Sequence, residues 1–394
     1  MTVAVDFKNV DIIFGENPAN ALSMAEKGAS RAEILEKTGA VLGCAGANLT
    51  VHEGEISVLM GLSGSGKSTL LRAVNRLNKV TRGNIFVKYG DRTVDVATCD
   101  EVTLRNVRQK QVAMVFQQFG LLPWRTVEEN VGLGLELAGV PDAERKTRVH
   151  KQLQLVGLDQ WARKYGHELS GGMQQRVGLA RAFATEAPIL LMDEPFSALD
   201  PLIRTKLQDE LLDLQAKLKK TIVFVSHDLE EALKIGTHIT IMEGGRIVQT
   251  GAPEDIVLRP ANDYVRDFIA NVNPLSVLTA WNVMRSLHEL ERAEKGWVWL
   301  DRRKTTKFKI DNDGLVAAAE REGKPAVWVS CADVDKDLAE ADQRVFWATP
   351  GTSLKTVMLA MHRSNTAPVA LFDEASRFVG AIGVRDVLHA VLGR

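Results

Sequence analysis

Short apolar runs alternate with segments of helical periodicity along the first 250 or so residues of the chain. Residues 189–192 and 221–225 are uncharged runs that end in polar residues, a pattern typical of buried strands in a parallel sheet. Between about residues 118 and 185 helical patterns, such as residues 142–156, replace strand patterns. The alternation predicts an α/β fold, with a mostly parallel sheet flanked by helices and a helical subdomain.

The pattern changes near residues 271–274, whose sequence Asn-Val-Asn-Pro predicts a boundary between domains 1–270 and 275–394. In the second domain, two apolar runs within residues 369–382 are separated by a polar turn and predict a hairpin. Residues 384–391 follow with a helical pattern. We therefore expect a small α+β domain at the C-terminal end of the chain.

Residues 61–69 match the phosphate-loop pattern with no mismatch. Its glycines let backbone N–H groups approach phosphate oxygens, Lys67 reaches the β/γ oxygens, and the Ser68 hydroxyl suits a magnesium ligand. The expected phosphate-binding residues are Gly61, Ser63, Gly64, Ser65, Gly66, Lys67, Ser68 and Thr69.

A second glycine segment offers another anion site. Ser170 precedes Gly171, Gly172 and a polar helical start, so a hydroxyl and backbone N–H groups meet at a helix N-terminus. The apolar run that follows ends in Asp193 and Glu194. Asp193 would hold magnesium through water, and Glu194 would act as general base toward the attacking water. A solvated carboxylate at the end of a strand is the plainer interpretation of Glu194.

These segments resemble the ABC ATPases, because six motifs occur in the order found in that family. They are the phosphate loop, a glutamine after Phe116, the Ser-Gly-Gly segment, Asp193-Glu194, residues 197–200 and His227. In that family two heads close face to face over two ATP molecules, each head completing the other's site. The resemblance implies ATP and Mg²⁺ as cofactors and a homodimer as the active form.

The family's roles carry over to three further residues. Gln117 resembles the glutamine that senses magnesium and links the nucleotide to the membrane partner, with Gln118 as an alternative. Asp200 resembles the aspartate that crosses the dimer interface, although it also precedes Pro201 as a helix cap would. His227 resembles the switch histidine that contacts the γ-phosphate, so the implied catalytic residues are Glu194, His227 and Lys67.

Adenine is expected to stack on Phe14, the aromatic end of a strand predicted at residues 7–14. Phe14 lies 53 positions before Lys67, well beyond the usual family spacing, so residues 17–40 form an insertion. Asn17 and Pro18 predict the start of one helix, and Ser30 with Glu33 forms a capping box for a second. Helices this short are only marginally stable in water on their own, so they are expected to dock on the domain or on a partner.

The insertion resembles a segment of the quaternary-amine importers. That resemblance implies an ATP-hydrolysing subunit that energises import of choline or, next, glycine betaine. Its partners would be a transmembrane permease and an extracytoplasmic substrate-binding protein, at the cytoplasmic face of the inner membrane. The alternatives are a soluble ABC ATPase of DNA repair or translation and an exporter subunit. Repair proteins typically carry a second head or a coiled-coil insertion, and neither pattern is seen here.

Composition agrees with this interpretation. The 394 residues suffice for two or three domains, and a net charge of −1 argues against nucleic acid as a partner. No apolar stretch reaches the ~18 residues expected of a membrane helix. Cys44, Cys99 and Cys331 are scattered and show no paired spacing.

The second domain resembles one CBS module in its later half, whereas only residues 277–284 suggest the pattern in its first half. This degenerate first half favours choline, as it suits a nutrient importer better than an osmotically gated one. The domain also carries a basic cluster with two interpretations: a solvated charged face, or a contact with anionic lipid headgroups. The cluster comprises Arg302, Arg303, Lys304, Lys307 and Lys309.

Overall fold

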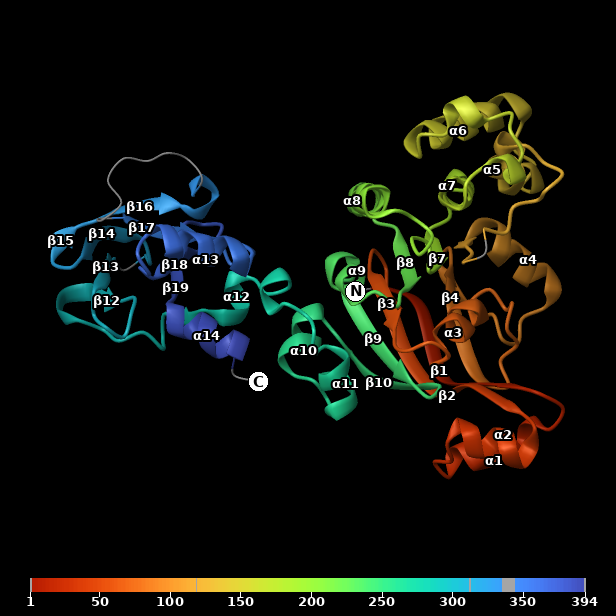
Figure 1. The fold of residues 1–394 in the computed structure, drawn as a ribbon, viewed down its shortest axis with the longest axis horizontal. Coiled ribbons are helices and arrows are strands. Elements are labelled where there is room, and N and C mark those ends of the chain that lie inside the picture. Colours follow the sequence, from red (N-terminus) through yellow and green to blue (C-terminus); the bar gives the residue numbers. More distant parts are fainter. Residues whose placement is uncertain (1, 118, 312, 335–343, 393–394) are drawn as a thin grey trace. The chain divides into compact units, whose positions relative to one another are not determined.

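The computed structural model describes residues 2–117, 119–311, 313–334 and 344–392. It divides the chain into two compact units. The ATPase unit comprises residues 1–256 and 260–269, and the C-terminal unit comprises residues 257–259 and 270–394. Figure 1 draws both units with their elements labelled.

A six-stranded sheet forms the centre of the ATPase unit and confirms the α/β prediction. Its strands β3, β7 and β8 are buried at every position, as expected of mainly apolar strands in a parallel sheet; Asp193, the last residue of β7, is the one charged residue among them. All neighbouring pairs are parallel except β10 with β9. The order is β10 (Arg246–Gly251), β9 (His238–Glu243), β3 (Ile56–Met60), β8 (Thr221–Val225), β7 (Ile189–Asp193) and β6 (Val112–Val115).

The alternation of apolar runs did not predict a second, antiparallel sheet in the same unit. Register shifts interrupt its long first pair, which obscures the two-residue period in the sequence. Both sheets contribute side chains to one hydrophobic core, together with helix α3 (Lys67–Ala73). The strand order is β2 (Val41–His52), β1 (Val3–Phe14), β4 (Arg82–Tyr89) and β5 (Arg92–Asp95).

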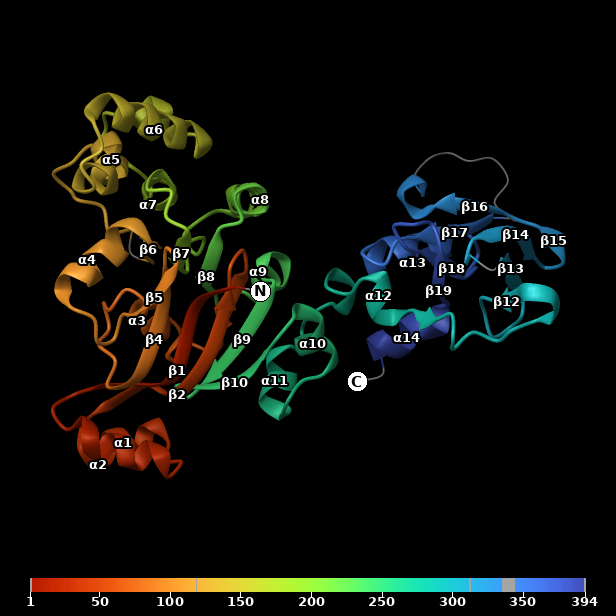
Figure 2. The same cartoon turned by 180° about the vertical axis from the view of Figure 1, so that it is seen from behind.

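Three helices form the helical subdomain, and they share a core of their own. They are α5 (Val127–Leu137), α6 (Asp142–Leu155) and α7 (Gly171–Ala184). Seen from the front and from behind, these helices lie together at the opposite end of the unit from helices α1 and α2 (Figures 1 and 2). The remaining helices are α4 (Glu101–Lys110), α8 (Pro201–Leu218), α9 (Leu229–Ile235), α10 (Pro253–Leu258) and α11 (Asp263–Phe268).

The insertion forms two short helices, α1 (Pro18–Glu26) and α2 (Arg31–Thr38). Ser30 and Glu33 make both hydrogen bonds of the capping box, but Asn17 makes no side-chain cap on α1. Apolar side chains from both helices pack against β1 and β2 and form a separate core cluster. The buried members are Ile13, Ala21, Ala25, Ile34, Ala40, Leu42 and Ala45.

The C-terminal unit contains two sheets. In the larger, β18 (Val369–Phe372) and β19 (Phe378–Ile382) pair antiparallel as the hairpin expected from the sequence. Its order is β11 (Arg285–Ser286), β19, β18, β17 (Arg344–Ala348) and β16 (Val327–Ser330). Three helices accompany these strands: α12 (Ala280–Val283), α13 (Leu354–Arg363) and α14 (Val384–Leu392).

The smaller sheet of this unit is an antiparallel meander, and it occupies the part of the sequence where the CBS-like pattern fails. Its strands are β12 (Trp297–Trp299), β13 (Thr306–Ile310), β14 (Val316–Arg321) and β15 (Lys324–Pro325).

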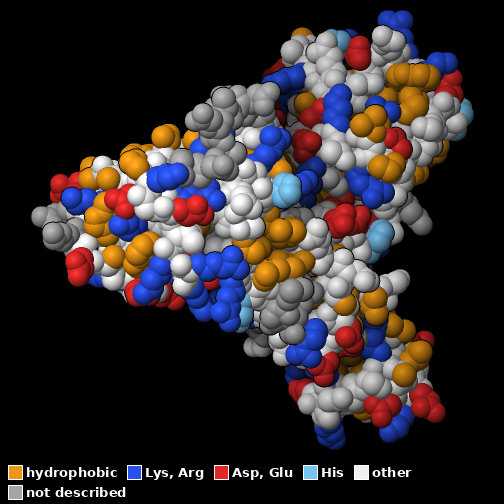
Figure 3. Space-filling model, turned by 60° about the vertical axis from the view of Figure 1, so that its left-hand side comes forward, with side chains coloured by type: hydrophobic (Ala, Val, Ile, Leu, Met, Phe, Trp, Pro, Cys, Tyr) orange, Lys and Arg blue, Asp and Glu red, His pale blue; other side chains and the backbone are white. Residues whose placement is uncertain are grey.

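Charged side chains of both signs are interspersed over the face drawn in Figure 3. This distribution agrees with the near-zero net charge of the chain. Within the described residues, no helix is both long enough and apolar enough to cross a membrane.

Docking of the insertion can be tested at two adjacent positions of α2. Ile34 is fully buried, whereas Leu35 is 50% exposed. We expect Ile34→Ala to lower the free energy of unfolding of the ATPase unit by about 2 kcal/mol or more, because it leaves a cavity. Leu35→Ala is the matched control and should stay within about 0.5 kcal/mol. Urea unfolding measures both; equal small effects would show that the insertion is not packed on the sheet.

Candidate functional site

The phosphate loop connects β3 to α3, and two of its glycines are required by close backbone contacts. A Cβ on Gly61 would lie 2.1 Å from the Met242 carbonyl oxygen, and one on Gly66 would lie 2.4 Å from that of Gly43. Both glycines also have positive φ angles, 138° and 102°, which other residues adopt only with strain. The loop is thus held against β9 of the central sheet and β2 of the antiparallel sheet, while Ser63 and Gly64 remain exposed.

The loop folds around the ammonium group of Lys67. Its Nζ donates to the carbonyl oxygens of Gly61 at 2.8 Å and Leu62 at 2.9 Å. Burial lowers the pKa of Lys67, and the carboxylates of Glu194 and Asp193 oppose that shift. The Lys67 ammonium also donates to the Ser65 hydroxyl at 3.5 Å. A partly desolvated cation held by neutral oxygen atoms is suited to pairing with phosphate oxygens.

Asp193, at the end of β7, is fully buried and binds two side chains of α3. The Ser68 hydroxyl donates to Oδ1 at 2.6 Å, and Arg72 approaches Oδ2 at 2.8 and 2.9 Å. A hydroxyl beside a single carboxylate fits Mg²⁺, which keeps waters and phosphate oxygens among its ligands. The motifs did not predict that Arg72 would contact Asp193. Arg72 lies one helical turn after Ser68 and so on the same face of α3, which is the feature of the sequence that could have predicted this contact.

Two residues predicted for catalysis, Glu194 and His227, meet the predicted magnesium-sensing Gln117 where neighbouring parallel strands end. Glu194 Oε2 accepts a hydrogen bond from Gln117 Nε2 at 3.0 Å and lies 3.2 Å from His227 Nδ1. These residues follow β6, β7 and β8, whose carboxyl ends share one edge. Gln118, the alternative to Gln117, lies outside the described residues.

Glu194 adopts a left-handed conformation with φ 47°. Its backbone N–H donates to the carbonyl of Val225 at 3.1 Å, which holds the turn at the end of β7. A positive φ is uncommon outside glycine and clusters at functional sites. The turn aims a carboxylate at the edge where the phosphate loop also lies, instead of leaving it as a solvated strand end.

Phe14 is 41% exposed and lies beside the phosphate-loop helix. A Cβ on Gly43 would stand 2.8 Å from both the Phe14 ring and the Thr69 methyl group, so these side chains border the same small space. The insertion also reaches the loop, since the Arg31 guanidinium donates to the carbonyl of Gly64. This contact of Arg31 was not predicted from the sequence, although the capping box places Arg31 at the first position of α2.

The second predicted anion surface lies at the exposed start of α7. Ser170 caps this helix by accepting from Met173 N–H at 3.4 Å, and Gly171 is exposed. Asp200 caps α8 by accepting from Ile203 N–H at 3.0 Å. Among the described residues, no hydrogen bond joins Ser170 or Asp200 to the phosphate loop of this chain.

Comparison with known proteins matches residues 44–197 to the ABC transporter family. The glycine betaine/proline betaine transport system ATP-binding protein of Salmonella typhimurium is 43% identical, over 99% of this chain and 98% of the relative. The glycine betaine transport ATP-binding protein of Bacillus subtilis is 42% identical, over 99% and 92%.

A solved dimeric ATP-binding cassette, in a post-hydrolysis state with ADP and Pi bound, is 31% identical with a TM-score of 0.55. The match covers 63% of this chain and 98% of that one. Because relatives covered along nearly their full length share more than two fifths of its residues, the chain belongs to the ABC transporter ATP-binding subunits, the ATPases that include these glycine betaine/proline betaine proteins.

Proposed function

We propose that this ATPase subunit energises import of a quaternary amine through a separate transmembrane permease. The meeting of Gln117, Glu194 and His227 beside the phosphate loop carries the hydrolytic part of the proposal. The two-helix insertion and the names of the full-length relatives support the quaternary-amine part. An extracytoplasmic substrate-binding protein would deliver the amine to the permease. The position of the subunit would be peripheral, at the cytoplasmic face of the membrane.

The site residues are assigned to phosphate binding, adenine binding, Mg²⁺ binding and catalysis. Gly61 to Thr69 would hold the phosphates, Lys67 the β/γ oxygens, and Phe14 the adenine ring. Glu194 would accept a proton from the attacking water, and His227 would contact the γ-phosphate. Mg²⁺ would lie between Ser68, Asp193 and Gln117, where it would neutralise phosphate charge.

The exposed starts of α7 and α8 support a dimer in which each chain completes its partner's site. At this helix N-terminus Ser170 presents a hydroxyl, and Gly171 and Gly172 present N–H groups that have no partner within the helix, which favours phosphate binding. Since they do not bond to their own phosphate loop, we infer that they serve the nucleotide of a second copy. Asp200 would cross the same interface.

The loop between Gln117 and α5 is the candidate contact with the permease. Arg181 of α7 donates to the carbonyls of Phe119 and Gly120, at 3.1 and 2.6 Å, and so ties the loop to the helical subdomain. Trp124 in this loop is 71% exposed. Exposed aromatic side chains are enriched at protein interfaces. Gln117 at the start of the loop would transmit the state of the nucleotide.

Choline and glycine betaine remain the two candidate amines. The degenerate first half of the C-terminal unit favours choline. Glycine betaine is supported by the relatives that align along nearly the whole chain, whereas a choline transport ATP-binding protein of Bacillus subtilis aligns over 56% of each sequence.

Glu194→Gln tests the general base. The amide keeps the size of the side chain but cannot accept the proton, so the ATPase rate should fall about 10²- to 10⁴-fold while ATP still binds. The exposed Glu36→Gln variant is the control for loss of one carboxylate. Steady-state phosphate release and equilibrium nucleotide binding give the two readouts. A Glu194→Gln rate within a few-fold of the unaltered protein would remove Glu194 from this role.

Two substitutions test the phosphate loop and the start of α7 separately. Lys67→Ala should weaken ATP binding to the monomer, because it removes the cation inside the phosphate loop. Ser170→Arg should leave that affinity intact but prevent ATP-driven dimerisation, because its bulk faces the partner's nucleotide. Calorimetry and light scattering measure the two properties. Equal loss of monomer affinity in both variants would contradict the two-surface arrangement.

Uptake measurements distinguish choline from glycine betaine as the transported amine. In a strain that lacks this gene, we expect loss of labelled choline uptake at low osmolarity, restored by the unaltered gene but not by Glu194→Gln. Loss of glycine betaine uptake alone, under osmotic stress, would replace choline by glycine betaine. Unchanged uptake of both would reject the substrate class without affecting the ATPase assignment.

A further inference from the structure

The insertion reaches the phosphate loop through Arg31, at the first position of α2. The Arg31 guanidinium donates to the carbonyl of Gly64. That carbonyl belongs to the exposed tip of the loop, residues 62–64, whereas Gly61 and Gly66 near its two ends are buried. Close contacts with β9 and β2 fix these two glycines. Arg31 therefore holds the part of the loop that those contacts leave open.

The helix that carries Arg31 is itself fixed to the ATPase unit. Ile34, one helical turn after Arg31, is fully buried in the core cluster that the insertion shares with β1 and β2. On the neighbouring helix, the Ala25 carbonyl accepts from the Arg246 guanidinium at 2.6 Å, which ties the end of α1 to β10. Both helices of the insertion are thus held in place, so the Arg31 side chain extends from a docked support.

The stability of α2 does not explain an arginine at this position. The N-terminal end of a helix carries partial positive charge, which favours a carboxylate and disfavours a cation. Glu33, the carboxylate of the same turn, accepts from both the N–H and the hydroxyl of Ser30 at 2.8 Å. Among the described residues, Arg31 forms no ion pair with a carboxylate. The hydrogen bond to Gly64 is therefore the interaction that accounts for this residue.

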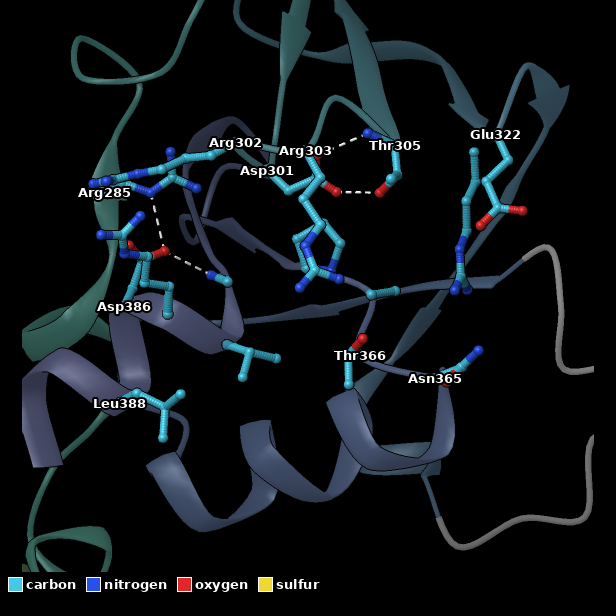
Figure 4. Close-up of a pocket in the computed structure, with 16 residues that line it drawn as sticks. Arg285, Asp301, Arg302, Arg303, Thr305, Glu322, Asn365, Thr366, Asp386 and Leu388 are labelled. Atoms are coloured by element: carbon cyan, nitrogen blue, oxygen red, sulfur yellow. Dashed lines mark hydrogen bonds and ion pairs between the residues drawn. The ribbon is translucent and has the colours of Figure 1, made fainter. Parts of the chain in front are cut away.

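Other arginines of the chain have carboxylate partners that neutralise their charge. In the C-terminal unit, Arg285 Nε lies 3.0 Å from Oδ2 of Asp386, a contact drawn in Figure 4. In the ATPase unit, Arg82 Nε lies 2.8 Å from Oδ2 of Asp11. The charge of Arg31 is not neutralised in this way within the described part of the chain. It remains beside the loop that is proposed to bind the phosphates.

We propose that Arg31 is a positioning residue for the nucleotide and acts through the tip of the phosphate loop. Because Arg31 holds the tip before ATP arrives, it lowers the cost of ordering the loop on binding. Its positive charge beside the loop also attracts phosphate oxygens. Both effects stabilise bound ATP and the transition state alike, so they strengthen nucleotide binding without changing the chemical step. This role rests on the phosphate binding proposed above for Gly61 to Thr69.

Arg31→Ala tests this role in the full chain. We expect the Kd and KM for ATP with Mg²⁺ to rise roughly tenfold, because a hydrogen bond from a charged donor is lost, while kcat changes little. Arg31→Lys keeps a charged donor and should restore most of the affinity. The matched control, Lys37→Ala, removes one positive charge from the exposed last turn of the same helix and should leave the constants unchanged. Calorimetry measures Kd, and phosphate release measures KM and kcat.

Urea unfolding without nucleotide separates positioning from a structural role, because Arg31→Ala should unfold with the free energy of the unaltered protein. Lost affinity together with a lower free energy of unfolding, as expected for Ile34→Ala, would make Arg31 only structural and overturn the proposal. Equal ATP affinity in Arg31→Ala and Lys37→Ala, or a lower kcat at unchanged KM, would also overturn it. Lys67→Ala is titrated alongside. If Lys67→Ala loses affinity, such a failure concerns Arg31 alone; if it does not, the phosphate-loop role is rejected as well.

Discussion

The buried carboxylate of Asp193 is the contact on which the ATP site depends. It joins the end of β7 to helix α3 through Ser68 and Arg72. A charge this deeply buried requires such partners, because desolvation would otherwise exceed any gain from packing. The same contact fixes the phosphate loop relative to Glu194, the next residue along the chain. Positions of the phosphate and of the candidate base are thus set together.

Parallel strand pairing supplies the rest of the geometry. Because β6, β7 and β8 run in one direction, Gln117, Glu194 and His227 emerge at one edge although they are far apart in sequence. The left-handed turn at Glu194 is held by a hydrogen bond to β8. Strain at this position is therefore offset by the sheet, and the side chains are organised before a nucleotide arrives.

The insertion and the C-terminal unit, the two regions outside the ATPase core, differ in the contacts that they make. The insertion packs on β1 and β2 and places Arg31 against the phosphate loop. The C-terminal unit instead packs its meander on its mixed sheet around an apolar core that includes Phe308 and Phe372. One region thus contacts the phosphate loop directly, and the other forms an apolar core of its own.

Local sequence determined much of this protein. Uncharged apolar runs specified the buried parallel strands, and the glycine pattern specified the phosphate loop, because both depend on short-range chemistry. The capping box fixed the start of α2 for the same reason. The antiparallel sheet, the contact of Arg72 with Asp193 and the ion pairs of Lys304 and Lys307 were decided only by tertiary structure. Pairing register, bulges and the partner of each charged side chain depend on residues distant in sequence, and no local pattern records them.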